Sequence, residues 1–238
     1  MERGGVDTEL GVTSEWKSEL SPNSATVAPL HLWRGVPEGR GEVKKTESLI
    51  MKILVLDNYD SFTYNLVHII RELGFTMDIF RNDKIAVEDV KQYDKILFSP
   101  GPGIPDEAGI MKEVVKVYGS SKSILGVCLG HQGIAEVYGA RLYNIPKVLH
   151  GVTSRATVVA KNEKLFQGLP ESFEVTHYHS WAVIPESMPE ELTLTAVNKE
   201  GMVMGLAHKK YDVRGVQFHP ESIMTEHGPR IIENWLKD

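Results

Sequence analysis

The sequence predicts an α/β protein in which helices flank a mostly parallel sheet and an antiparallel strand region is added to it. Three observations support this. Lys52–Asp57 is a short apolar, β-branched run, and a stretch with helical apolar spacing follows it. This alternation of strand and helix repeats as far as Gly139. Closely spaced strand-like runs then dominate the rest of the chain, which indicates antiparallel pairing.

The first half of the expected fold is a series of strand-helix units. Polar residues at 58–61 can cap a helix, and Gly74 can end it. The apolar face of this helix carries Phe62, Leu66, Ile69, Ile70 and Leu73. Further strands are expected at 76–80, 95–99 and 123–127, and further helices at 107–118 and 132–138. Ligands of parallel sheets bind beyond the carboxyl ends of the strands, so the turns after Asp57, Ser99 and Val127 are the expected site of chemistry.

The second half is expected to complete a single domain over residues 51–238. Its strands are predicted at 154–160, 173–178, 192–197, 203–208 and 215–218, with a last helix at 229–236. Residues 1–50 are rich in Gly, Pro, Ser and Glu without periodicity, which predicts a disordered extension. Because Met51 stands directly before the first strand, one hypothesis is that translation starts there.

The composition of the chain argues against some classes of binding partner. The net charge of -6 argues against nucleic acid and against anionic membranes, because both require clustered basic residues. No apolar run approaches the roughly 20 residues that cross a bilayer. One cysteine cannot form an internal disulfide, so we expect a cytoplasmic protein whose partners are small molecules and proteins.

The strongest candidate for a nucleophile is Cys128, in the sequence Gly126-Val127-Cys128-Leu129-Gly130. A strand that enters a G-x-C-x-G turn before a helix is the thiol analogue of the nucleophile elbow. Small flanking residues permit a tight turn, and the helix N-terminus favours the thiolate. A lone cysteine is otherwise most often a small buried apolar residue.

His219 and Glu221 are the candidate base and its orienting partner. They stand on either side of Pro220, at the end of a predicted strand, where positions two apart point to the same side. A carboxylate on one ring nitrogen fixes the tautomer and leaves the other nitrogen free to accept the thiol proton. Taken in isolation, the same two residues would be a surface pair.

The loop Pro100-Gly101-Pro102-Gly103 follows another strand and can bring bare backbone close to a substrate. The N–H groups of Gly103 and Leu129 could together stabilise an oxyanion. The alternative is a rigid turn. His177 and His179 offer only two candidate metal ligands, and we therefore expect no metal site.

Five motifs in order make the chain from Met51 onward resemble the class I (triad-type) glutamine amidotransferases, and specifically the small subunits of anthranilate synthase and aminodeoxychorismate synthase. The resemblance implies a flavodoxin-like sheet. The motifs are Asp57-Asn58-Tyr59-Asp60-Ser61-Phe62-Thr63-Tyr64-Asn65, Ser99-Pro100-Gly101-Pro102-Gly103, Gly126 to Gln132, Tyr178-His179-Ser180 and Gln217 to Glu221. Gly133, where Ala is commoner, and Val152, where Lys is usual, depart from the family pattern.

The resemblance implies that L-glutamine forms a γ-glutamyl thioester on Cys128, with His219 as base and then acid, and Glu221 behind it. It implies that glutamine is held by Gly101, Pro102, Gly103, Gln132, Ser180 and the backbone of Trp181. Ammonia would pass inside a heterodimer or heterotetramer to a chorismate-binding large subunit, which makes anthranilate for tryptophan biosynthesis, 4-amino-4-deoxychorismate for folate biosynthesis, or both. No cofactor is expected in this subunit, and Mg²⁺ is expected only in the large subunit.

Two other functions fit parts of the sequence. A free-standing cysteine hydrolase would cleave γ-glutamyl or peptide substrates without a partner. A catalytically idle regulatory subunit would keep the fold but lose the chemistry, although the intact elbow and the intact His219-Pro220-Glu221 argue against that.

Overall fold

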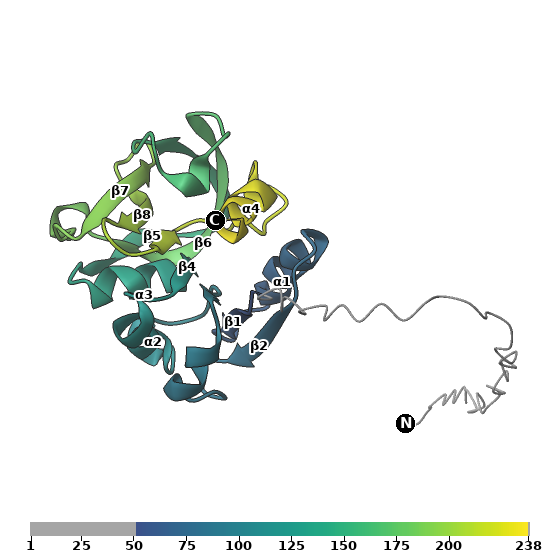
Figure 1. Cartoon of the computed structure of the whole chain (residues 1–238). Helices are drawn as coiled ribbons and strands as arrows, with labels where there is room; N and C mark the ends of the chain where they lie inside the picture. Colours follow the sequence, from purple (N-terminus) through teal and green to yellow (C-terminus); the bar gives the residue numbers. More distant parts are fainter. Residues whose placement is uncertain (1–50, 238) are drawn as a thin grey trace, which may run out of the picture. The chain divides into compact units, whose positions relative to one another are not determined.

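The computed structural model describes residues 51–237 of the 238-residue chain. The predicted extension, residues 1–50, lies outside the described residues. Within residues 51–237, nine strands form one sheet in the order β2-β1-β3-β4-β9-β8-β7-β5-β6. Figure 1 shows β1 and β2 at one side of the fold and β5, β7 and β8 at the other.

The first five strands of that order are parallel. This was predicted for the first four along the chain, whereas the strand expected at 215–218 was assigned to the antiparallel region and β9 in fact pairs parallel with β4. Burial on both faces explains why the sequences of β1, β3 and β4 are nearly continuous apolar runs and do not alternate. β1, β3 and β4 are the most apolar because they lie inside this half of the sheet, whereas β2 is an edge strand and is partly exposed. The five strands are β1 (Ile53–Asp57), β2 (Met77–Arg81), β3 (Lys95–Phe98), β4 (Ser123–Val127) and β9 (Val213–Val216).

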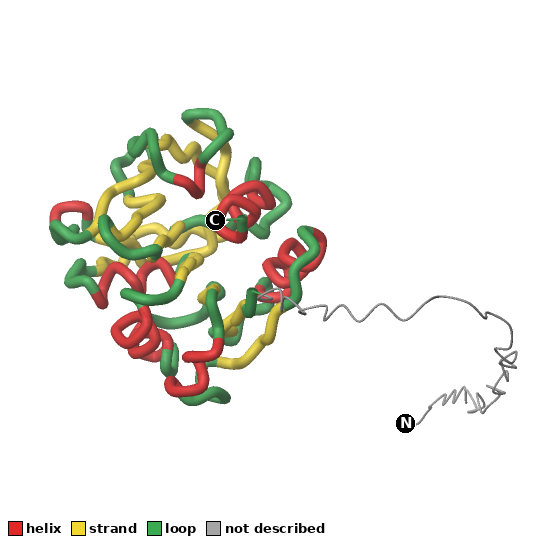
Figure 2. The backbone as a smooth tube through the Cα atoms, in the orientation of Figure 1, coloured by secondary structure: helices red, strands yellow, loops and turns green. Residues whose placement is uncertain are grey.

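Helices cover both faces of the parallel half (Figure 2). α1 (Thr63–Glu72) and α4 (Gly228–Leu236) contribute to one hydrophobic core cluster. α2 (Met111–Tyr118) and α3 (Leu129–Val137) contribute to a second cluster on the opposite face. The sheet is therefore the middle of three layers, and its carboxyl edge remains open for a site.

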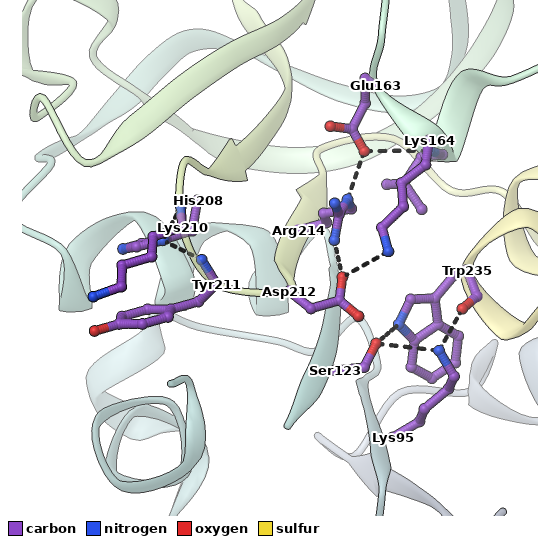
Figure 3. A network of polar contacts seen from close by, with 11 residues as sticks. Lys95, Ser123, Glu163, Lys164, His208, Lys210, Tyr211, Asp212, Arg214 and Trp235 are labelled. Carbon is purple, nitrogen blue, oxygen red and sulfur yellow. Dashed lines mark hydrogen bonds and ion pairs between the residues drawn. The ribbon is translucent and has the colours of Figure 1, made fainter. Parts of the chain in front are cut away.

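The last helix is fixed to the opposite edge of the sheet by a buried lysine. Lys95 Nζ donates a hydrogen bond to the carbonyl of Trp235 over 2.8 Å, and the Trp235 indole donates to Ser123 Oγ over 3.0 Å (Figure 3). A cation near the carbonyls at a helix C-terminus is favourably placed. These contacts attach α4 to β3 and β4.

The other half of the sheet is antiparallel, as predicted. β9 pairs antiparallel with β8, and the pairs β7·β8, β5·β7 and β5·β6 are antiparallel too. The strands are β5 (Leu142–Val158), β6 (Ser172–Val183), β7 (Leu192–Val197) and β8 (Val203–His208). Short 3-10 helices lie at η1 (Val87–Gln92), η2 (Pro105–Glu107), η3 (Lys164–Phe166) and η4 (Pro185–Ser187).

Two helix boundaries were predicted wrongly. The helix expected from residue 107 begins at Met111, because Pro105 starts a separate 3-10 turn and Gly109 has a φ of 52°. The helix expected from residue 132 begins at Leu129, directly after Cys128. This second shift places the cysteine at the helix N-terminus.

Strand boundaries also differ from prediction in the antiparallel half. β5 begins at Leu142 and not at residue 154, and register shifts interrupt its pairing with β6. The apolar pattern missed this part because most of its side chains are at least partly exposed. β6 continues to Val183, so Ser180 and Trp181 lie on a strand. β9 runs from Val213 to Val216, two residues earlier than the predicted strand. None of the helices within residues 51–237 is long and apolar enough to cross a membrane.

Candidate active site

Cys128 forms the turn between β4 and α3. Its backbone has φ 52° and ψ -99°, a conformation that costs a non-glycine residue energy and that recurs at nucleophile elbows. The cysteine is the residue before the first turn of α3, where free N–H groups and the helix dipole favour negative charge. The turn predicted from the G-x-C-x-G sequence is confirmed by this backbone.

The two flanking glycines are required for close packing. A Cβ on Gly126 would meet the backbone of Gly130 and come within 2.7 Å of His131 N. A Cβ on Gly130 would lie 2.7 Å from the Cβ of Phe98 on β3. Real Cβ atoms do not approach other atoms so closely, so both positions exclude any side chain. The start of α3 therefore lies directly against the sheet.

His219 and Glu221 are in contact, as predicted, and both are buried. Nδ1 of His219 lies 2.7 Å from Oε1 of Glu221. The extended backbone that we expected between them is wrong, because Ser222 N–H donates to His219 O over 3.2 Å and closes a turn. His219 N–H also donates to Thr176 O on β6, and Thr225 Oγ1 donates to His219 O. The pair is thus held by a turn anchored to β6.

The imidazole of His219 interacts with both Cys128 and Glu221. Burial alone would lower the pKa of His219, but the polar and charge interactions with Cys128 and with Glu221 outweigh it and raise the pKa to about 10. Because Nδ1 is occupied by Glu221, the nitrogen left for the thiol is Nε2, which is buried and has no formed hydrogen bond within residues 51–237. This arrangement suits a thiolate beside an imidazolium.

A pocket of about 170 Å³ opens over the sulfur. Cys128 lines it together with all six residues expected to hold glutamine, namely Gly101, Pro102, Gly103, Gln132, Ser180 and Trp181. His219 and Glu221 do not line it. The sequence did not predict the other lining residues, which are Val148, Leu149, His150, Tyr178 and His179.

Gly103 and Leu129, the predicted oxyanion donors, come from the loop after β3 and the first position of α3. Within residues 51–237 neither N–H has a hydrogen-bond acceptor. The two residues also share a neighbouring hollow of about 210 Å³ with Pro102. Gly103 has a φ of 74°, in the left-handed region that favours glycine. The oxyanion role stays a prediction, consistent with this placement.

Asn58 holds the Pro100–Gly103 loop, a role that the sequence did not assign. Its N–H donates to Ser99 Oγ over 2.8 Å, and its Nδ2 donates to Ser99 O over 2.7 Å. A Cβ on Gly101 would lie 2.6 Å from Asn58 O, so loop and turn are in direct contact. Its position one residue beyond the first strand was the available signal.

Gln217 and His179 also take part in the site. Gln217 Nε2 lies 3.6 Å from Cys128 Sγ, and its Oε1 accepts from Gln132 Nε2. Gln132 Nε2 and His179 Nδ1 both contact Trp181 O, each at 2.8 Å. The sequence signal for Gln217 was its position two residues before His219.

Tyr178 and Phe62 form an aromatic cover over the base. The Tyr178 ring packs edge-on against His219 with a centroid distance of 5.1 Å, and Phe62 lies 5.3 Å from Tyr178. His150 also packs edge-on against Tyr178. The rings limit the contact between water and the imidazole.

Residues 54–238 match the family model described as "Glutamine amidotransferase class-I". The chain belongs to this family. It is 44% identical over 191 residues to anthranilate synthase component 2 of Mycobacterium tuberculosis, which covers 78% of this chain and 82% of the relative. It is 43% identical over 187 residues to aminodeoxychorismate/anthranilate synthase component 2 of Bacillus subtilis, which covers 78% and 95%.

A solved structure from Thermoplasma acidophilum, of a protein described as part of a GMP synthase, has the same fold. It superposes on this amidotransferase with a TM-score of 0.71 at 30% identity, covering 79% of this chain and 93% of the other. The predicted fold class and the resemblance drawn from five motifs are therefore confirmed.

Of the two departures from the family pattern, Gly133 has a local explanation and Val152 lies away from the pocket. A Cβ on Gly133 would lie 2.5 Å from Cε of Met111, so an alanine there would displace this side chain of α2. Val152 is 40% exposed on β5 and does not line the pocket at Cys128. His177 and His179, the two candidate metal ligands, contact each other over 3.2 Å, and within residues 51–237 no cluster of three His, Cys, Asp or Glu could hold a metal.

Proposed function

We propose that this amidotransferase hydrolyses L-glutamine to glutamate and ammonia, with Cys128 as nucleophile. One observation carries the proposal. The only cysteine of the chain sits on a positive-φ turn at a helix N-terminus, lines a pocket with bare glycine backbone, and interacts with a histidine that is oriented by a buried carboxylate. These are the parts that amide cleavage through a thioester requires.

In the first half of the reaction, the Cys128 thiolate attacks the side-chain carboxamide carbon of glutamine. The carbonyl oxygen becomes an oxyanion, which the N–H groups of Gly103 and Leu129 stabilise. The His219 imidazolium then donates its Nε2 proton to the leaving nitrogen. The C–N bond breaks, ammonia departs and a γ-glutamyl thioester remains on the sulfur.

In the second half, neutral His219 removes a proton from water, which attacks the thioester carbon. The C–S bond breaks, glutamate leaves and the sulfur departs as thiolate beside the regenerated imidazolium. Glu221 holds the ring in one orientation and stabilises its charge throughout. These steps use side-chain and backbone groups only, and the Mg²⁺ that we propose for the complex belongs to the chorismate-binding subunit.

We further propose that the ammonia is consumed by a synthase subunit that binds chorismate, in a heterodimer or heterotetramer. The names of the two relatives support this, because both are component 2 of a synthase. The same names point to two products of the complex, anthranilate and 4-amino-4-deoxychorismate. Ammonia in water near neutral pH is mostly protonated and not nucleophilic, so direct transfer between subunits would protect it.

The test is product formation by the complex with Cys128→Ala. The wild-type complex should aminate chorismate with either glutamine or ammonium salt, whereas the variant complex should respond only to ammonium salt. Mass spectrometry of the aminated product identifies the pathway. Glutamate release that persists in the variant would refute the assignment of the nucleophile.

A second measurement separates this function from that of a free-standing hydrolase. Glutaminase activity of the isolated subunit should be weak and should rise when the synthase subunit is added. Full activity without a partner would support the free-standing hydrolase. An intact subunit that neither releases glutamate with its partner nor reacts with a glutamine-analogue alkylator would be a regulatory one.

A further inference from the structure

The sulfur of Cys128 has a polar neighbour that the proposed mechanism does not use. Nε2 of Gln217 lies 3.6 Å from Cys128 Sγ, a normal separation for an N–H···S hydrogen bond. Gln217 is fully buried, one residue beyond β9, and its backbone N–H donates to Met204 O over 2.9 Å. A buried amide held in this way has little freedom to turn elsewhere.

The orientation of the Gln217 amide follows from its neighbours. Gln132 places one amide atom 2.8 Å from the backbone carbonyl of Trp181, which can only accept, so that atom is the nitrogen. The same nitrogen lies 3.2 Å from the side chain of Gln217, so the Gln217 atom that faces it must be the oxygen. The nitrogen of Gln217 is then the atom that faces the sulfur.

His179 reinforces this orientation from the other side of Trp181. Its Nδ1 lies 2.8 Å from Trp181 O and must carry a proton, so its Nε2 can accept from His177 Nδ1 at 3.2 Å. His177 Nε2 then accepts from Ser154 Oγ at 2.7 Å. Burial lowers the pKa of His177 to about 3 and that of His179 to about 4, so both rings are neutral.

We propose that Gln217 donates a hydrogen bond to the Cys128 thiolate, and thereby stabilises the reactive form of the thiol and aims it at the pocket. This deepens the proposed function and rests on Cys128 as its nucleophile. A hydrogen bond to the charged form of a group favours that form. The chain from Ser154 to Trp181 O and Gln132 holds the donor in place.

The titratable groups near the sulfur come from four segments. His219 and Glu221 lie after β9, Tyr178 and His179 lie on β6, His150 lies on β5, and His131 lies on α3. Burial lowers the pKa of His131 to about 3, whereas the interactions with Cys128 and Glu221 outweigh burial and raise the pKa of His219 to about 10, so neither ring changes its charge near neutral pH. A change made at Gln217 adds or removes no titrating group unless the new residue is acidic.

The experiment is the pH dependence of Cys128 alkylation by iodoacetamide in the full chain. Cys128 is the only cysteine, so all label reports on this thiol. Iodoacetamide reacts with the thiolate. Gln217→Met keeps the length of the side chain and removes the donor, and it should shift the midpoint of the rate against pH upward by about one unit, a roughly tenfold lower rate below the midpoint.

Two further variants should shift the midpoint by amounts that differ from the shift in Gln217→Met. Gln217→Glu places an acceptor against the sulfur and should shift the midpoint further than Gln217→Met. Gln132→Met keeps the donor but removes its restraint, so it should shift the midpoint in the same direction by less. Gln92→Met is the matched control, because Gln92 is exposed at the end of η1, far from Cys128 in the fold, and its side chain donates a hydrogen bond to Asp89 O. Its curve should coincide with that of the wild type.

Several results would overturn the proposal. One is a Gln217→Met curve with the wild-type midpoint; another is a lower plateau rate without a shift, which would indicate altered access only. A shift in Gln217→Glu without one in Gln217→Met would show an effect of added charge. If Gln217→Met does not fold, Gln132→Met decides the matter by the presence or absence of its smaller shift. The assay uses neither glutamine nor synthase, so failure of the proposed function would leave this result readable.

Discussion

Nδ1 of His219 lies 2.7 Å from Oε1 of Glu221, and both side chains are almost completely buried. The other two polar atoms of the pair, Nε2 of His219 and Oε2 of Glu221, have no formed hydrogen bond within residues 51–237. Buried polar atoms without partners are uncommon and cost free energy. A base held with one nitrogen free is expected where that nitrogen must exchange a proton during turnover.

Glu221→Gln should reduce glutamine hydrolysis severely. The amide keeps the shape of the carboxylate but loses the charge that orients the ring and stabilises the imidazolium. The kcat measured with the synthase partner should fall by roughly 10²- to 10⁴-fold, with KM little changed. Glu190→Gln, at an exposed position, is the control and should retain full activity. An unchanged kcat in Glu221→Gln would exclude Glu221 from the triad.

We also expect the loss of unfolding free energy in Glu221→Gln to depend on pH. Because the folded-state pKa of His219 is raised to about 10, its protonated form contributes stability that is complete below its unfolded pKa near 6.5 and is lost as pH rises through about 10. The destabilisation by Glu221→Gln should therefore shrink between pH 6.5 and pH 10. Urea unfolding of both proteins across this range measures it. A difference in unfolding free energy that is constant with pH would contradict the raised pKa.

Gly103→Ala should impair catalysis more than binding. The residue has a φ of 74°, and an added Cβ would collide with Oε2 of Glu107. Displacing one oxyanion donor should lower kcat by roughly 10- to 10³-fold. Adding Glu107→Ala removes the collision but leaves the backbone strain. If the double variant recovers full kcat, the loss came from the collision and not from the position of the N–H.

Gly126→Ala tests the packing beneath the nucleophile. The new methyl group would overlap the backbone of Gly130 and force α3 away from β4. Overpacking of this kind costs about 1–3 kcal/mol, and the shift should also slow the alkylation of Cys128. Gly126 is not among the glycines with a positive φ, so the loss would come from the overlap and not from backbone strain. Wild-type stability in Gly126→Ala would indicate that contact with Gly130 is unimportant.

Lys95 also makes the free energy of unfolding depend on pH, in the direction opposite to His219. Burial, with smaller contributions from Lys164 and Arg214, lowers its folded pKa to about 8 (Figure 3). Between pH 8 and the unfolded value near 10.4 the unfolded chain binds more protons, so stability should rise with pH in this window. Urea unfolding should show wild type gaining on Lys95→Met over that range.

Because His219 is common to both proteins, its contribution cancels in this comparison. Lys199→Met, at a highly exposed side chain, should show no such trend. A wild-type advantage over Lys95→Met that does not change from pH 8 to pH 10 would show that Lys95 keeps an ordinary pKa.

Much of the parallel half could be predicted because its burial leaves a clear local pattern. β1 and β4 are continuous apolar runs, and α1 has its apolar residues on one face. β5 could not be predicted in full, because an exposed strand with register shifts has neither the apolar alternation nor the burial that mark a strand. The start of α3 was missed for another reason, since Cys128 itself occupies the cap position in a conformation that propensity does not anticipate.

By itself, the sequence determined the fold class and the elbow turn at Cys128, and it predicted His219 and Glu221 as the catalytic partners of the cysteine, because each is a local pattern of residue types with a known physical role. Only the tertiary structure decided how those parts meet. Three contacts depend on how strands and turns pack. They are the turn that joins His219 to Glu221, the hydrogen bonds of Asn58 to the loop after β3, and the amide nitrogen that Gln217 presents to the sulfur. Hydrogen bonds between side chains distant in sequence leave no periodic trace, so three-dimensional packing alone reveals them.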